Sequence, residues 1–213
     1  MTPPADAPPA LLQVAQRYEQ STRGIVVFKL HRVLEAHGGF SSHREDVVMN
    51  GVYDDGVLVK VRVSQYAVNG KSANAGAVSA LEESWNHPAA GDVFAPPFLA
   101  DDFDGYAYRE GGPWTIDFSS NVHDAGHGNG SFSYDAQYNV VTCTYEPNVL
   151  PPHAASGEIV DRRAEVLPGY WAVTQELQQY KGSYGPFSAA GSVQVTYSNF
   201  QRFPDLQSAL SAL

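Results

Sequence analysis

The chain has 213 residues, and its 13 Lys and Arg side chains against 23 Asp and Glu give a formal net charge of −10. A chain of this length buries about 70% of its unfolded surface, so it can form one stable domain without a disulfide or a structural metal. The basic residues are scattered, which argues against nucleic acid and anionic membrane surfaces as partners, because both require a concentrated cationic field.

The N-terminal residues are rich in Pro and Ala and contain neither the basic segment nor the apolar core of an intact signal peptide. We expect residues 1–8 to be a disordered lead of an exported protein whose signal peptide has been removed. No segment approaches the roughly 18 consecutive apolar residues of a membrane-spanning helix.

The first elements follow from a change of hydrophobic period. Apolar residues at helical spacing, such as Leu11 and Val14, predict a helix over Pro9–Ser21. From Gly24 the period becomes two, which predicts a long strand that ends at Gly38-Gly39 and a second strand over His43–Tyr53.

Asp54-Asp55-Gly56 predicts a tight hairpin turn, because Asp and Gly tolerate the positive φ angles that such turns require. A third strand is expected over Val57–Val68. Its valines at 57, 59, 61 and 63 are predicted to face the core, and Lys60, Arg62 and Ser64 to face solvent.

A short helix is predicted over Ala77–Asn86, with Leu81 and Trp85 four residues apart and Pro88 as its stop. Ala89–Asp104 is expected to form a loop or a second short helix. The remaining strands share alternating apolar and polar residues, and a small helix follows them. They are Tyr106–Arg109, Trp114–Ser119, Gly130–Tyr134, Asn139–Glu146, Gly157–Leu167, Tyr170–Gln179 and Ser192–Arg202, with the helix over Leu206–Leu213.

The single cysteine, Cys143, excludes an intrachain disulfide and a two-cysteine metal clip. It lies in the apolar run 140–145, which is typical of a half-buried strand residue. A nucleophilic thiolate needs a neighbouring base or helix N-terminus, and the local sequence contains neither. We therefore expect Cys143 to pack rather than react.

These elements predict an α+β fold that is mostly antiparallel β, in a single domain over residues 1–213. Consecutive strands joined by tight turns form a meander, and a meander of eight to ten long strands must curl or close. We expect a highly curved half-barrel sheet whose concave face is covered by the N-terminal helix and by the inserted helices.

The element order, with a helix, three strands around Tyr53-Asp54-Asp55-Gly56, a helical insertion and a final run of strands, resembles a known family. Local similarities are Gly130–Asp135 followed by Asn139-Val140-Val141, and the terminal Val193–Phe200. The chain resembles the half-barrel of periplasmic lipoprotein carriers and related lipid-binding lipoproteins, the LolA/LppX/RseB-like group. The resemblance covers nearly the whole chain in element order, with few residue identities and no catalytic motif.

The resemblance implies a non-enzymatic protein of the periplasm or cell envelope. Its partner would be a hydrophobic small molecule, a lipid or the acyl chains of a lipoprotein, with a contact to the membrane periphery or an envelope protein as a further expectation. Sequestration would gain about 0.8 kcal/mol for each CH₂ removed from water. No cofactor and no metal is expected. Three arginines, Arg32, Arg44 and Arg62, are open candidates for the carrier arginine that contacts the lid.

We expect five residues to bind the ligand. Trp114 follows a Gly-Gly-Pro turn and Trp171 follows Pro168-Gly169, so each begins a strand near a rim and is a candidate for the cavity mouth. Phe28, Leu30 and Trp85 complete the predicted set. The other aromatic side chains are expected to pack in the core and across strands.

Two alternatives stay open from the sequence. His123 and His127, with the distant His153, would supply three zinc ligands to a secreted metal-dependent enzyme. The intervening glycines and the missing Glu after the first His favour a solvated turn instead.

An aromatic content of 12%, including 12 Tyr, allows a carbohydrate-binding β-sandwich. Asp102–Gly105 lacks the downstream Glu of a calcium loop.

Overall fold

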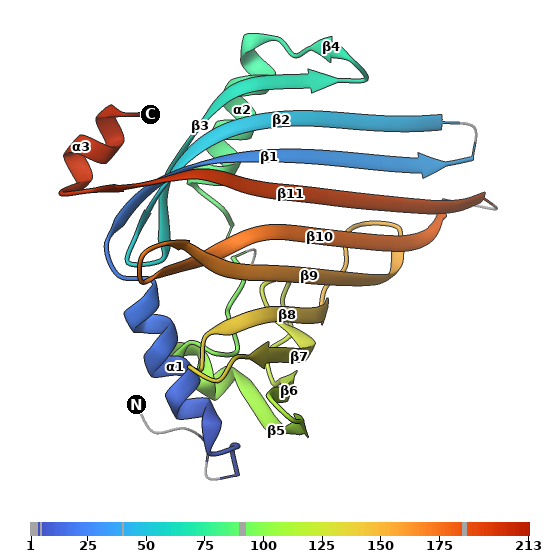
Figure 1. Ribbon diagram of the computed structural model, residues 1–213. Helices are drawn as coiled ribbons and strands as arrows, with labels where there is room; N and C mark the ends of the chain where they lie inside the picture. Colours follow the sequence, from blue (N-terminus) through green and yellow to red (C-terminus); the bar gives the residue numbers. More distant parts are fainter. Residues whose placement is uncertain (1–3, 5, 40, 90–92, 185–186) are drawn as a thin grey trace.

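The computed structural model describes residue 4 and residues 6–39, 41–89, 93–184 and 187–213. Its main feature is one open antiparallel sheet in the order β4-β3-β2-β1-β11-β10-β9-β8-β7-β6-β5 (Figure 1). The elements are α1 (Ala10–Ser21), β1 (Ile25–Gly38), β2 (Ser41–Asp54), β3 (Val57–Val68), β4 (Lys71–Ser72), α2 (Ala75–Asn86), the 3₁₀ helix η1 (Ala100–Gly105), β5 (Tyr106–Gly112), β6 (Thr115–Ser120), β7 (Gly128–Tyr134), β8 (Val140–Pro147), β9 (Ala154–Leu167), β10 (Tyr170–Tyr184), β11 (Phe187–Phe203) and α3 (Leu206–Ser211).

The sheet does not close, because its two outer strands, β4 and β5, are not neighbours. This confirms the predicted half-barrel. The strands differ in length. Five of them, β1, β2, β9, β10 and β11, have 14 to 17 residues, whereas β5 to β8 have six to eight. The long strands therefore extend to one side beyond α1, as Figure 1 shows.

Residues that face each other across antiparallel strands point to the same side of the sheet. One such row of directly paired residues crosses nine strands. It consists of Tyr66, Val47, Arg32, Val195, Glu176, Asp161, Cys143, Phe132 and Ile116. We call the side that carries this row the inner face.

Both long helices pack on the inner face. Leu11 and Val14 of α1 belong to a buried cluster with Phe132 and Cys143. At the other end of the sheet, Trp85 of α2 packs with its neighbour Leu81 on the cluster that includes Val47, Met49 and Val195. Two charged members of the row, Glu176 and Asp161, lie between Val195 of one cluster and Cys143 of the other.

The prediction for β3 is wrong for two of its four valines. Val57 is 67% exposed and Val59 is 38% exposed, although Val61 is fully buried. The pairing of β2 with β3 shifts between Val52 and Tyr53, so that Leu58 pairs with Tyr53 and packs against the core cluster. This irregularity adds a residue to β3 and exchanges its faces at that point.

Several boundaries differ from the sequence prediction. The second helix begins at Ala75, because the Asn74 side chain accepts a hydrogen bond from the Ala77 backbone and caps it. Trp114 lies in a turn with φ of 60° and not in the following strand.

Cys143 is fully buried rather than half-buried. Part of the Pro-rich lead, at 1–3 and 5, lies outside the described residues, while Pro8 is buried.

Candidate functional site: a cavity and a polar strip on the inner face

A cavity of about 400 Å³ lies at the far end of the long strands. Its floor contains the paired residues Ala36 and Gly191, and next to them Gly38 and Ala189. Tyr180 pairs with Gly191 and is also part of the lining, so the floor belongs to the inner face. The space exists because the side chains of the floor residues are small. The segment 151–153, before β9, lines the cavity from the side.

A chain of hydrogen bonds leads from this cavity along β10. The Tyr180 hydroxyl donates to Oε1 of Gln178 at 3.0 Å, and Nε2 of Gln178 donates to Oε1 of Glu176 at 2.5 Å. These residues are two apart along the strand and therefore share the inner face. They form a polar strip between the cavity and the centre of the sheet.

A second set of polar contacts begins at the cavity and follows β2. His43 lines the cavity, and its Nε2 lies 3.0 Å from Oε1 of Glu45. Nη1 of Arg32 donates to Oε2 of the same carboxylate at 3.1 Å. Burial acts to raise the pKa of Glu45, but the hydrogen bonds from His43 and Arg32 outweigh it, and the net pKa is lowered.

The structure distinguishes the three early arginines. Arg32 lies on the inner face, opposite Val47 and Val195. Arg44 alternates with the inner-face Glu45 and forms an ion pair with Glu35 on the other side of the sheet. Arg62 is exposed. Arg32 is therefore the candidate among these three that contacts the site.

At the centre of the inner face, Asp161 on β9 and Glu176 on β10 are directly paired. Asp161 is 8% exposed, and its Oδ1 has no hydrogen-bond partner within the described structure. Burial and the neighbouring Glu176 together raise the pKa of Asp161 to about 7, against the opposing effect of Arg163. Burial also raises the pKa of Glu176, against the hydrogen bond from Gln178.

The five predicted ligand residues fall in three places. Phe28, Leu30 and Trp85 come together in the core cluster beneath α2. Trp114 is 53% exposed at the turn before β6, where it makes an edge contact with Tyr134. Trp171, at the start of β10, is half-buried. The described lining of the inner-face cavity includes none of these five, and their contact with a ligand stays a prediction.

Four residues of the site were not predicted from the sequence: Tyr180, Gln178, Glu176 and Asp161. Glu176 and Gln178 flank the apolar Leu177, a pattern that is equally typical of the solvent-facing side of a strand. The available signal was the placement of acidic residues in two consecutive long strands, but only the strand register shows that Asp161 faces Glu176.

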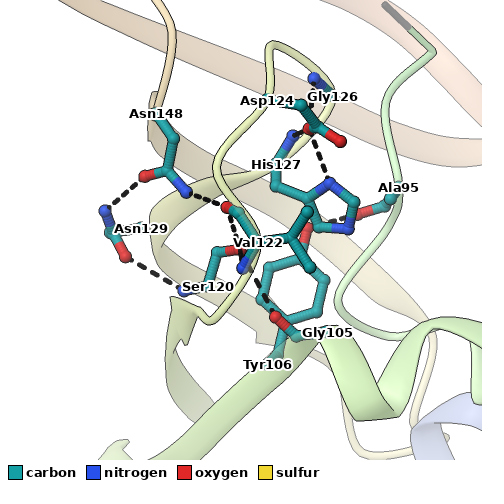
Figure 2. Close-up of polar contacts among 10 residues, drawn as sticks. All are labelled: Ala95, Gly105, Tyr106, Ser120, Val122, Asp124, Gly126, His127, Asn129 and Asn148. Carbon is teal, nitrogen blue, oxygen red and sulfur yellow. Dashed lines mark hydrogen bonds and ion pairs between the residues drawn. The ribbon is translucent and has the colours of Figure 1, made fainter. Parts of the chain in front are cut away.

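His127, one of the predicted zinc ligands, contacts Asp124, and the two residues hold a loop together (Figure 2). Oδ1 of Asp124 accepts hydrogen bonds from the backbone N–H of Gly126 at 3.0 Å and of His127 at 2.9 Å, and it lies 2.7 Å from Nδ1 of His127. Among the described residues, no three His, Cys, Asp or Glu side chains converge to hold a metal ion. The contacts support a structural role for this loop.

No family model and no curated protein matches the chain. Among solved structures, a domain described as an outer-membrane lipoprotein-sorting protein, from Vibrio parahaemolyticus, aligns with a TM-score of 0.50 and 12% identity, over 92% of this chain and 93% of that one. The chain has a LolA-like fold. At this identity the LolA-like similarity concerns the fold alone.

Two further structures are similar at lower scores. A LolA superfamily protein from Nitrosomonas europaea aligns with a TM-score of 0.39 and 8% identity, over 92% of this chain and 94% of that one. Lipovitellin aligns with a TM-score of 0.45 and 10% identity, over 87% of this chain and 26% of that one.

The described LolA-like sheet is single rather than a two-sheet sandwich. None of its described helices is long and apolar enough to cross a bilayer.

Proposed function

We propose that this protein binds a hydrophobic ligand, a lipid or the acyl chains of a lipoprotein, on the inner face of its half-barrel. It would act in the cell envelope as a binding protein without catalysis. The observation that carries this proposal is the cavity of about 400 Å³ floored by Ala36, Gly38, Ala189 and Gly191. Its volume falls within the roughly 300–1,000 Å³ of small-molecule sites.

The free energy of binding would come from removing hydrocarbon from water, at about 0.8 kcal/mol for each buried CH₂. The similarity to a domain described as lipoprotein-sorting supports a lipid or lipoprotein as ligand. Phe28, Leu30 and Trp85 would contact the tail of a longer ligand if α2 moved away from the sheet. Trp114 and Trp171 stay proposed rim contacts, away from the cavity.

The proposal is tested by filling the cavity. Gly191→Leu adds an isobutyl group at a position where a Cβ would have its nearest neighbour, the Glu35 carbonyl oxygen, 3.6 Å away, so the backbone need not move. We expect this variant to lose at least ten-fold in affinity for a fluorescent fatty acid. Ala36→Leu, from the neighbouring strand, should have the same effect and guards against a folding defect in the first variant.

Gln194→Leu is the matched control, because it adds a similar apolar group on the exposed side of the same strand. Organic extraction and mass spectrometry of the purified protein should recover a bound lipid. A protein that takes up no fluorescent fatty acid and yields no lipid would contradict the proposal, as would equal affinity in the Gly191→Leu and Gln194→Leu variants.

A further inference from the structure

Asp161 and Glu176 are directly paired acidic residues, of which Asp161 is buried and Glu176 is partly buried. The apolar neighbours in the same row are Val195 on one side and Cys143 on the other. Glu176 receives one described hydrogen bond, from Gln178. Oδ1 of Asp161 is buried and receives none from any described residue. A buried oxygen without a hydrogen-bond donor costs about 1–3 kcal/mol, so the site is incomplete as it stands.

The two arginines whose charge affects the pair, Arg163 and Arg32, contact other partners. Arg32 donates to Glu45 at 3.1 Å. The Arg163 guanidinium lies over the ring of Tyr18 on α1, 4.8 Å from its centroid, and its Nη2 donates to the Trp171 carbonyl oxygen at 3.4 Å. Their long-range attraction reaches the pair, but neither is hydrogen-bonded to Asp161 or Glu176 in the described contacts. Among the described residues, no cationic side chain therefore donates a hydrogen bond to Asp161 or Glu176.

A monocationic hydrogen-bond donor matches this pair. Two adjacent carboxyl groups in a low-dielectric site tend to share one proton, which leaves one negative charge between them. An ammonium group carries one positive charge and three N–H donors, so it can neutralise that charge and supply the missing hydrogen bond to Asp161.

We propose that Asp161 and Glu176 bind the protonated amine of an amphiphile whose hydrocarbon tail extends along the inner face toward the cavity. This inference rests on the proposed function and adds the chemical class of the ligand. Glu176 is only partly buried, as are Gln178 and Leu34 on the inner face between the pair and the cavity, so each keeps some contact with solvent. Tyr180 and Glu176 are four residues apart, about 13 Å along the strand, a span that a long alkyl chain covers.

The test compares three ligands of equal chain length at pH 7: dodecylamine, dodecanol and dodecanoate. Each is used below its micelle concentration to displace an uncharged fluorescent probe of apolar sites from the protein. We expect dodecylamine to bind at least ten-fold more tightly than dodecanol, and dodecanoate to bind most weakly. The alcohol isolates the contribution of the tail, since it lacks the charge.

Asp161→Asn and Glu176→Gln keep the shape of each side chain and remove its negative charge. Each should reduce the preference for amine over alcohol at least five-fold. Glu158→Gln is the control, because Glu158 is exposed on the same strand as Asp161 and points to the other side. Urea unfolding of each variant verifies that it is folded.

The outcomes separate the two proposals. If dodecanol binds and dodecylamine binds no more tightly, the amine site is wrong and the hydrophobic binding function stands. A preference that persists in the Asp161→Asn/Glu176→Gln double variant would also overturn the amine site, because the amine would then lie elsewhere. If none of the three ligands displaces the probe, both proposals fail.

Discussion

Asn86 at the end of α2 hydrogen-bonds both backbone groups of Val61 on β3: the Val61 N–H donates to Oδ1 at 2.8 Å, and Nδ2 donates to the Val61 carbonyl oxygen at 3.2 Å. One turn earlier, Oε1 of Glu82 accepts from the Val63 N–H at 2.7 Å. The short β4 pairs with β3 at Ala67 and Val68, and side chains of α2 take the place of a further strand at Val61 and Val63. They protect an edge that would otherwise pair with another chain.

The first prediction concerns this helix–strand contact. Asn86→Ala removes both hydrogen bonds to Val61, and we expect it to lower the free energy of unfolding by about 1–3 kcal/mol. Chemical denaturation in urea measures the change. Ser79→Ala, on the exposed side of α2, is the control and should change stability little. Equal unfolding midpoints for Asn86→Ala and wild type would show that the contact does not hold the helix.

The second prediction concerns Gly51, which pairs with Phe28. A Cβ at this position would lie 2.4 Å from Cζ of the Phe28 ring, which is itself buried. We expect Gly51→Ala to destabilise the fold by about 1–3 kcal/mol through overpacking. The smaller side chain in Phe28→Leu should reduce the cost of Gly51→Ala, a coupling that a double-mutant cycle measures.

Gly191→Ala is the matched control for this prediction, because a Cβ there has its nearest neighbour at 3.6 Å. It should be close to neutral. A cost of Gly51→Ala that is the same in the wild-type and Phe28→Leu backgrounds would contradict the steric explanation and would assign the effect to the backbone.

Much of the fold follows from local patterns in the sequence. The Asp-Gly turn is correct: Asp55 and Gly56 have φ of 48° and 80°, the positive values that this hairpin requires. Consecutive strands pair as predicted wherever a short connection joins them. The irregularity near Val59 was not predictable, because a single extra residue in a strand leaves the alternation of valines intact in the sequence while exchanging the faces in the structure.

The candidate site was less predictable than the fold. Phe28, Leu30 and Trp85 lie together at the core cluster beneath α2, and their contact with a ligand stays a prediction, whereas the cavity depends on small residues such as Gly191, which carry no binding signal of their own. The facing of Asp161 and Glu176 depends on register between strands, and register is shifted by irregularities at points on either side of them in this pair of strands.

The third prediction concerns the loop held by Asp124. Asp124→Ala removes the acceptor of the Gly126 and His127 backbone N–H groups, and we expect both amides to exchange with solvent at least ten-fold faster. Hydrogen exchange followed by NMR measures this. Asp104→Ala, an exposed carboxylate of η1, is the control. Unchanged protection at Gly126 and His127 would contradict the structural role of Asp124.

The last prediction uses the raised pKa of Asp161. Burial raises this pKa to about 7 in the folded protein, whereas an unfolded Asp has a pKa of about 3.9. Between these values the folded state holds a proton that the unfolded state has lost. Stability therefore falls as the pH rises through this window, and the loss is complete above about pH 7.

Asp161→Asn cannot ionise, so it should escape this loss. We expect its free energy of unfolding, relative to that of wild type, to increase by on the order of 2 kcal/mol between pH 4 and pH 8. Urea unfolding at each pH measures the difference between the two proteins and cancels the titration of groups that do not interact with Asp161. Glu19→Gln, which removes an exposed carboxylate from α1, is the control and should follow wild type at every pH. A difference between Asp161→Asn and wild type that stays constant with pH would mean that Asp161 ionises as an ordinary surface carboxylate does, and would remove the basis for treating it as a buried acid.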